Sequence, residues 1–292
     1  MSMRTSSCLI DERSLLNAAD YPIDETDHPT RETTIHKVRL SLANDGCAVI
    51  RNFLSPLGLK TLLNEAKARR DNAYFSDIRQ TNVYFSADDS ALPADHPRRM
   101  FMERSNGFIT SDCYGDETAS RRLYYWPPLM RFIADCLNKE HLFIYDDPVA
   151  NMIVNVGRPG SQFNWHFDTN EFTITMLLKG ADSGGHFEYV PNLRSETDEC
   201  YDDVRSILNG ERSRVTRRNL APGDLQVFLG RFSLHRFNEN TGCTDRLLLI
   251  MSFAEKPGMI GSVERTRELY GKLTPLHLAA KAQRIRADTL MD

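Results

Sequence analysis

The chain has 292 residues, of which 41% are hydrophobic and 26% charged, and its formal net charge is −4 at pH 7. This is an ordinary globular composition, and the slightly acidic balance argues against nucleic acid as a partner. There is no run of about 18 apolar residues and no signal-peptide core, so we expect a cytoplasmic protein that does not bind membranes. We interpret the scattered cysteines as free thiols: Cys8, Cys47, Cys113, Cys136, Cys200 and Cys243.

In chain order, the elements suggest a short leader and one enzyme-sized domain. Residues 1–35 are polar and rich in turn formers, so we expect an irregular leader. Residues 36–292 should form a single domain, with mostly helical support in 36–141, a barrel core in 142–256 and closing helices in 257–292.

Helices are predicted from capping residues and apolar spacing. Ser55 followed by Pro56 opens a helix whose apolar residues recur at helical spacing, and a pair of prolines before Leu129 opens another. Ser195, with acidic residues after it and a glycine at 210, predicts a further helix over 196–209. One or two closing helices are expected in 262–286.

The region between the supporting and closing helices contains short apolar or alternating runs that indicate strands. They lie near 142–146, 149–156, 172–178, 186–190, 215–219, 225–229 and 246–253, separated by glycine and proline clusters. Many short strands with such turns indicate a double-sheet jelly roll. We therefore predict a mainly β protein with supporting helices around a double-stranded β-helix core.

A metal-binding pattern stands out within these predicted strands. His166 and Asp168 are two residues apart, so in extended chain both side chains point to the same face. His235 must come from another strand, and Arg246 follows after a turn-rich stretch, so we expect Arg246 to enter the cavity from the strand next to His235. Two imidazoles and a carboxylate on one face of a metal are typical of non-haem Fe(II), with open positions for other ligands.

The remaining histidines are weaker candidates, because a lone histidine is more often a structural residue than a ligand. We interpret five of them as structural: His28, His36, His96, His141 and His277. His186 follows two glycines, and its position relative to the cavity stays open.

With its distal histidine and the arginine that follows, the His-x-Asp motif resembles the pattern of Fe(II)/2-oxoglutarate-dependent oxygenases. The phrases at 45–53, 184–190 and 221–225 are also similar to that family. Over roughly residues 40–270 the chain most resembles the radical halogenases of free amino acids, best known for free lysine, and their hydroxylase relatives. The resemblance implies that Fe(II), 2-oxoglutarate and O2 are used, that succinate and CO2 are released, and that the substrate is a small polar molecule such as a free amino acid.

The same resemblance assigns roles to the residues of the motif. His166, Asp168 and His235 would be the catalytic metal ligands, and Arg246 would bind the far carboxylate of 2-oxoglutarate. Halogenases of this type have glycine at the position of Asp168, which leaves a coordination site for chloride. Because the carboxylate is present here, the resemblance implies a hydroxylase and not a halogenase.

One position departs from the family pattern. Many members have Arg-x-Ser, and this chain has Leu248 where the serine would be, so Thr175 or Thr173 must supply any second contact to the cosubstrate. For the substrate, we predict Arg104 as a carboxylate clamp. The residues Asn151, Asn155 and Asn170 flank the predicted barrel strands and are candidates to meet an amine.

Other functions stay open from the sequence. The basic run at 211–218 would suit the phosphate of a nucleotide or another phosphorylated small molecule, although we interpret it first as a solvated strand edge. A non-enzymatic jelly roll that keeps a metal only for structure is a second alternative, and Arg246 argues against it. An oxygenase that acts on a protein is a third, and a homodimer is compatible with the sequence.

Overall fold

The computed structural model describes residues 10–280 and 288–291. Its core consists of two antiparallel sheets and confirms the predicted jelly roll. The large sheet has, in spatial order, β1 (Cys47–Ile50), β12 (Leu225–Phe228), β9 (Thr173–Lys179), β14 (Arg246–Met251), β7 (Met152–Gly157), β5 (Gly107–Ile109) and β2 (Tyr74–Phe75). The small sheet has β11 (Thr216–Arg218), β10 (Phe187–Val190), β13 (Leu234–Phe237) and β8 (Phe163–His166).

Side-chain alternation gives the large sheet two different faces. One face is apolar and packs into the main hydrophobic core, with Met152, Val154 and Val156 from β7 and Leu247, Leu249 and Met251 from β14. The intervening residues face the other way and line a cavity, among them Ile153, Asn155, Arg246, Leu248 and Ile250. Because successive residues of a strand point to opposite faces, one strand can serve the core and the cavity together.

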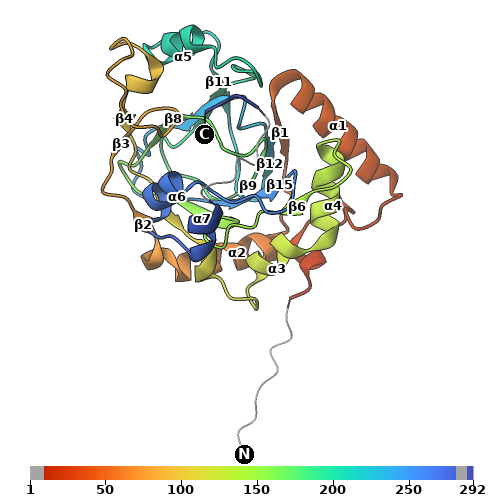
Figure 1. Cartoon of the computed structure of the whole chain (residues 1–292). Coiled ribbons are helices and arrows are strands. Elements are labelled where there is room, and N and C mark those ends of the chain that lie inside the picture. The colour runs from red at the N-terminus through yellow and green to blue at the C-terminus, as the bar shows by residue number, and fades with distance from the viewer. Residues whose placement is uncertain (1–9, 281–287, 292) are drawn as a thin grey trace, which may run out of the picture.

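Four helices cover the apolar face of this sheet: α1 (Pro29–Asp45), α2 (Pro56–Ala68), α3 (Ala119–Tyr125) and α4 (Pro127–Cys136). Figure 1 shows α1 and α4 side by side, with α2 and α3 close to them. The predicted cap is present, because Oγ of Ser55 accepts from the N–H of Gly58 at 3.0 Å. Helix α4 also begins at the pair of prolines, as predicted. Buried Phe53 and Phe132 stack at 6.1 Å between these helices.

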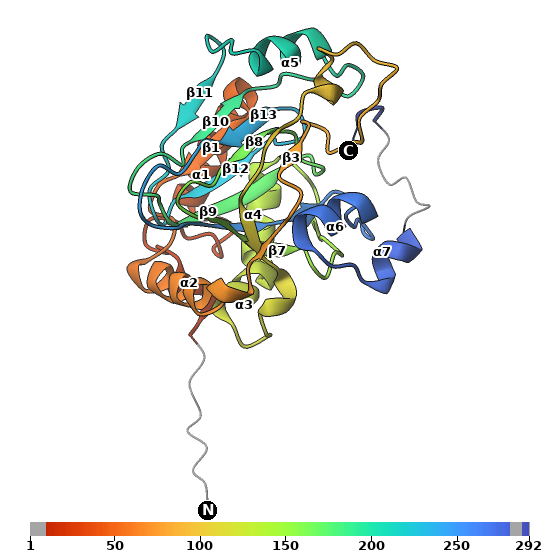
Figure 2. The same cartoon turned by 90° about the vertical axis from the view of Figure 1, so that its left-hand side faces the viewer.

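The small sheet packs against α5 (Tyr201–Leu208), which lies at the opposite end of the molecule from α2 and α3 (Figure 2). The predicted helix over 196–209 is too long at its start. Cys200 has φ 51°, a left-handed conformation that a helix cannot continue through, and Ser195 pairs with Asp198 in a turn instead. The helix therefore begins at Tyr201.

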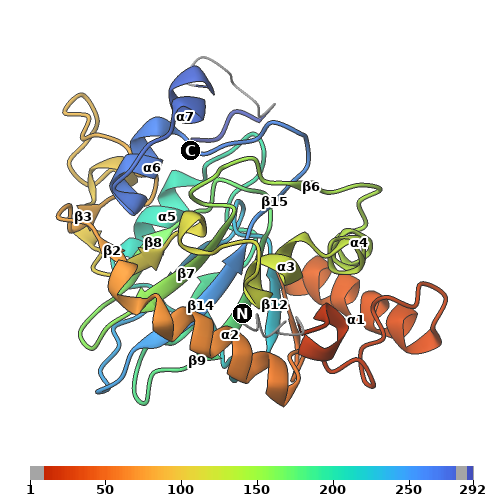
Figure 3. The ribbon, with the colours of Figure 1, turned by 90° about the horizontal axis from the view of Figure 1, so that it is seen from below.

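Two further helices follow the last strands, α6 (Val263–Tyr270) and α7 (Pro275–Ala280). Seen from below, they lie on the far side of the strands from α1 (Figure 3). Nε2 of His277 lies 3.0 Å from Oδ2 of Asp147, and both side chains are fully buried, so this contact joins α7 to the loop before β7. The part of the predicted closing helices beyond residue 280 lies in residues 281–287, outside the described residues.

Two sequence expectations about the N-terminal half differ from the structure: the irregular leader over 1–35 and the helical region over 36–141. Helix α1 starts at Pro29, inside the expected leader, and Leu15, Leu16 and Ile23 are buried in the core. The expected helical region also contains β1 to β5, including β3 (Gln80–Thr81) paired with β4 (Met102–Glu103). Such short strands carry little periodic signal, and here they cover the edges of the sheets formed by later strands. A short pair, β6 (Phe143–Ile144) with β15 (Phe253–Ala254), completes the sheets.

Two other expectations concern composition. Across residues 10–280 and 288–291, no helix has the length and apolar character needed to cross a membrane. The cysteines in the described part of the chain are free, as expected: Cys47, Cys113, Cys136, Cys200 and Cys243. Cys8 lies outside that part.

Candidate active site

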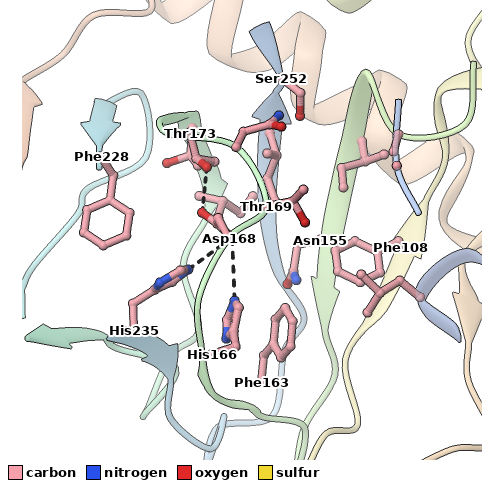
Figure 4. Close-up of a pocket in the computed structure, with 18 of the residues that line it drawn as sticks. Phe108, Asn155, Phe163, His166, Asp168, Thr169, Thr173, Phe228, His235 and Ser252 are labelled. Carbon is pink, nitrogen blue, oxygen red and sulfur yellow. Dashed lines mark hydrogen bonds and ion pairs between the residues drawn. The ribbon is translucent and has the colours of Figure 1, made fainter. Parts of the chain in front are cut away.

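Three side chains that can bind a metal meet on β8 and β13. His166 ends β8, Asp168 follows two residues later, and His235 lies on β13 opposite His166 in the register of the two strands. Their candidate ligand atoms all lie within 4.8 Å of one another. The Nε2 atoms of His166 and His235 lie 3.9 and 3.4 Å from Oδ1 of Asp168, and Figure 4 shows both rings directed at this carboxylate.

Backbone carbonyls orient both imidazoles. Nδ1 of His166 lies 2.7 Å from the carbonyl oxygen of Asn164, and Nδ1 of His235 lies 3.0 Å from that of Ser233. Because a carbonyl can only accept, each Nδ1 carries the proton and donates it, which leaves the lone pair of Nε2 for a metal. Burial, together with neighbouring His235, lowers the pKa of His166 well below its usual value, so this ring is neutral at physiological pH.

The carboxylate of Asp168 is fixed by the residues around it. Oγ1 of Thr173 donates to Oδ2 at 2.6 Å, which leaves Oδ1 facing the imidazoles. The N–H of Asp168 donates to the carbonyl of Gly230 at 3.0 Å. Burial raises the pKa of Asp168, but His235, His166 and the Thr173 hydroxyl outweigh burial and hold it below its ordinary value. The carboxylate is therefore ionised at neutral pH and suited to a cation.

Arg246 brings an isolated cation into the same cavity. Its side chain is buried, and its guanidinium lies 5.2 Å from the centre of the Phe237 ring. Among the residues that the structure describes, no carboxylate pairs with it, and its Nη1 has no hydrogen-bond partner. Burial lowers the pKa of Arg246 to about 10, so it stays charged at neutral pH. A buried cationic fork of this kind suits the far carboxylate of 2-oxoglutarate.

The strand that carries Arg246 is not the one we expected. The sequence suggested that Arg246 lies on the strand next to His235. In the structure β13 belongs to the small sheet, whereas β14 lies between β9 and β7 in the large sheet. The segment 238–245 crosses from one sheet to the other, so Arg246 and the candidate metal ligands reach the cavity from facing sheets.

Several expected cosubstrate and substrate residues also line this cavity. Thr175 lines it and donates to Oε1 of Gln226 at 3.1 Å, and Thr173 and Leu248 line it as well. Asn155 and Asn170 are buried lining residues, and Oδ1 of Asn155 has no hydrogen-bond partner. Thr175 and Asn155 therefore stay candidates for contacts to cosubstrate or substrate.

The structure does not bring the other two substrate candidates to the cavity. Asn151 accepts from Oγ of Ser111 and donates to the Tyr125 hydroxyl at 3.3 Å, in a different pocket. The guanidinium of Arg104 is buried, donates to the carbonyl of Ile78 at 3.1 Å and lies 3.8 Å from Glu268. Both side chains therefore form hydrogen bonds or ion pairs with residues near them and do not line the cavity. His186 is also absent from the residues that line the cavity.

Reasoning from the sequence did not single out Arg265 and Asp147, which are among the charged residues of the lining. Arg265 and Asp147 both line the cavity, Arg265 from α6 and Asp147 from the loop before β7. Neither belongs to a motif or to a periodic pattern. Only the packing of α6 over the barrel mouth could have revealed them.

A jelly roll that holds two histidines and an aspartate beside an unpaired buried arginine, in a chain that matches a family model over most of its length, is an Fe(II)- and 2-oxoglutarate-dependent oxygenase. Fe(II) would be held by His166, Asp168 and His235, and 2-oxoglutarate by Arg246. More narrowly, the chain belongs to the family described as Halogenase D (HalD), whose model matches residues 30–270. No curated protein sequence matches the chain.

Solved structures share the fold at low sequence identity. A prolyl hydroxylase from Trichoplax adhaerens, in complex with a peptide fragment, is 14% identical over 80% of this chain and 96% of its own, with a TM-score of 0.51. The epimerase SnoN, in complex with Fe3+, alpha ketoglutarate and nogalamycin RO, is 13% identical over 76% and 84%, with a TM-score of 0.51. A 2OG-Fe(II) family oxidoreductase from Burkholderia pseudomallei is 13% identical over 77% and 92%, with a TM-score of 0.50. At these identities the likeness shows the fold alone.

Proposed function

We propose that this oxygenase hydroxylates an unactivated C–H bond of a small polar substrate, such as a free amino acid, with release of succinate and CO2. The observation that carries the proposal is the carboxylate of Asp168, which lies beside the two imidazoles where it would fill the third protein position of the metal centre. A halogenase of the resembling type needs that position for chloride. With Fe(II) and 2-oxoglutarate bound, such a centre activates dioxygen for C–H oxidation.

The surroundings of Asp168 support a role as a ligand and not an accidental substitution. Thr173 donates to one oxygen of the carboxylate and so turns the other toward the imidazoles. A Cβ at position 230 would lie 2.0 Å from Oδ2 of Asp168, so only glycine leaves room for the carboxylate there. Two neighbouring residues are thus adapted to an acidic side chain at this position.

The chain's own residues would also bind the cosubstrate and exclude water. Arg246 offers two nitrogens to the far carboxylate, with Thr175 and Gln226 as polar neighbours in the same cavity. The rings of Phe187, Phe228 and Phe237 line that end of the cavity. Aromatic walls around a buried cation keep it desolvated, which strengthens its attraction for an anion.

The two alternative functions are less well supported. In the basic run, Arg217 pairs with Glu188 at 2.8 Å, Arg214 pairs with Asp203 at 2.9 Å, and Arg218 pairs with Asp45. Cations that are already paired offer little to a phosphate. A purely structural metal site would not explain an unpaired buried Arg246 beside it. The cytoplasmic location and the homodimer remain predictions.

The proposal is tested by supplying purified protein with Fe(II), 2-oxoglutarate, oxygen and chloride and screening free amino acids for succinate release. Mass spectrometry of the products should show addition of one oxygen atom to the substrate. The variants His166→Ala, Asp168→Ala and His235→Ala should each abolish this product. Chlorinated product from the unaltered protein would contradict the proposal and return the chain to halogenase chemistry.

A further inference from the structure

The cavity has a second end, near Ile153 and Ile250, which lie four residues along the paired strands β7 and β14 from Gly157 and Arg246, and its chemistry bears on the substrate. Its walls are mostly apolar and come from one hydrophobic cluster that includes Phe108, Ile153, Phe163, Leu269 and Tyr270. The ring of Phe163 stacks on the imidazole of His166, with centroids 3.8 Å apart, so this apolar wall reaches the metal centre. A substrate that enters here meets hydrocarbon surface next to the reacting position.

One cation faces this apolar end. Arg265 of α6 lines the cavity, and its Nη2 donates to the carbonyl of Phe167 at 3.0 Å, one residue before Asp168. Its guanidinium also lies 4.3 Å from the centre of the Phe85 ring. Among described residues no carboxylate forms an ion pair with Arg265 within 4 Å, so most of its donors remain for a ligand.

The acid at this end of the cavity is already satisfied. Asp147 is fully buried and accepts from the N–H groups of Val149, Ala150 and Gly261 at 2.8, 2.9 and 3.1 Å. Its Oδ2 also contacts Nε2 of His277. Apart from Asp168, it is the one carboxylate among the described lining residues. A cationic group of a substrate would therefore find no free anionic partner here.

Glu268 does not neutralise Arg265, because its ion pair is with Arg104, whose guanidinium lies 3.8 Å from its carboxylate. Burial raises the pKa of Glu268, and the charges of Arg104 and Arg265 oppose this rise without outweighing it. Two arginines around one carboxylate leave one positive charge in excess. That charge is accessible through Arg265, because Arg104 lies outside the cavity lining.

From this arrangement we infer that Arg265 binds an anionic group of the substrate, and that the apolar cluster takes an uncharged hydrocarbon side chain. The inference rests on the proposed function and narrows its substrate class to a carboxylate with an apolar body. It assigns the clamp to Arg265 in place of Arg104. It also departs from a substrate with a cationic side chain, such as lysine.

Three ligands that differ by one group each can test this subsite. L-norleucine has a carboxylate and an unbranched hydrocarbon side chain, L-norleucinamide replaces the carboxylate with a neutral amide, and L-lysine adds a terminal amine. Their dissociation constants are measured by calorimetry with the Fe(II)- and 2-oxoglutarate-loaded protein under nitrogen, where no turnover occurs. We expect L-norleucine to bind roughly tenfold or more tightly than either of the other ligands.

The variant Arg265→Gln removes the charge and keeps a polar side chain. It should bind L-norleucine and L-norleucinamide about equally, whereas the unaltered protein separates them. Arg267→Gln, on the exposed face of the same helix, is the matched control and should keep the full difference. Thermal melting of both variants checks that they are folded.

The outcomes separate the subsite from the proposed function. The subsite is wrong if Arg265→Gln keeps the preference for the carboxylate, if L-lysine binds more tightly than L-norleucine, or if none of the three ligands binds. The proposed function fails independently if L-norleucine binds as expected but admitting oxygen yields neither succinate nor hydroxylated product. Hydroxylation of L-lysine with no binding of L-norleucine would support the function and overturn the subsite.

Discussion

The carboxylate of Asp168 occupies the space that any side chain on Gly230 would need. A Cβ on Gly230 would lie 2.0 Å from Oδ2 and 2.7 Å from Cγ of Asp168. The N–H of Asp168 also donates to the carbonyl of Gly230, so the two residues are held together through the backbone. An acidic ligand at 168 and the absence of a side chain at 230 are therefore linked.

This link predicts that Gly230→Ala disturbs the metal centre. The methyl group would push the Asp168 carboxylate away from the imidazoles, so Fe(II) affinity and hydroxylation should both fall by roughly tenfold or more. In an Asp168→Gly background the same alanine should have little further effect on Fe(II) affinity. Iron titration of the four proteins measures this coupling, and equal effects of Gly230→Ala in both backgrounds would contradict it.

Asp168→Gly by itself should abolish most hydroxylation. It removes one of the three proposed metal ligands and would empty a position that a halide could occupy. We expect strong loss of hydroxylated product in chloride buffer, with chlorinated product as an open outcome, because the substrate must also lie nearer the halide than the hydroxyl group. Mass spectrometry of the products measures the hydroxylated and the chlorinated substrate. Hydroxylation at the original rate would exclude Asp168 as a ligand.

Thr173 and Thr175 lie on the same face of β9 but should differ in effect. Thr173 holds Asp168, whereas Thr175 donates to Gln226. Thr173→Val should therefore weaken Fe(II) binding, while Thr175→Val should leave it unchanged and raise the KM for 2-oxoglutarate. Because the two substitutions are chemically identical, each serves as the control for the other, and the same response from both would show that the assignment is wrong.

Arg246→Gln should raise the KM for 2-oxoglutarate far more than that for the substrate. Loss of a charge-assisted contact of about 2–3 kcal/mol corresponds to roughly 30- to 150-fold. Steady-state kinetics with each ligand varied in turn measures the two constants. An unchanged constant for 2-oxoglutarate would place its far carboxylate elsewhere in the cavity.

The ion pair of Arg231 and Asp288 should stabilise the loop that carries Asp168. The Arg231 guanidinium is buried, meets Asp288 at 2.7 and 2.5 Å, and donates to the carbonyl of Thr169 at 3.0 Å. Asp288→Asn should lower the free energy of unfolding by about 2 kcal/mol, because it replaces charge-assisted hydrogen bonds to a buried guanidinium with weaker neutral ones. Asp202→Asn breaks an exposed pair with Arg205 and should cost less than about 1 kcal/mol in the same denaturation experiment.

The type of fold and the convergence of the candidate metal ligands could be predicted from the sequence because their signals are local. Residues that lie two apart in an extended chain point to the same face, so the side chains of His166 and Asp168 were expected to lie together. Alternating apolar runs that are separated by glycines indicate paired strands. Both arguments use only the geometry of a short stretch of backbone. These two arguments therefore do not depend on how the rest of the chain folds.

Only the tertiary structure decided which segments meet around those ligands. An apolar strand shows that one face is buried but not which sheet it joins, so Arg246 was expected beside His235 and lies in the facing sheet. Arg104 and Arg265 look alike in the sequence, yet Arg104 is taken up by Ile78 and Glu268 while Arg265 faces the cavity. The difference arises from the packing of α6 against β2 and β5, a contact between segments far apart in the chain. No periodicity or motif within either segment carries that information.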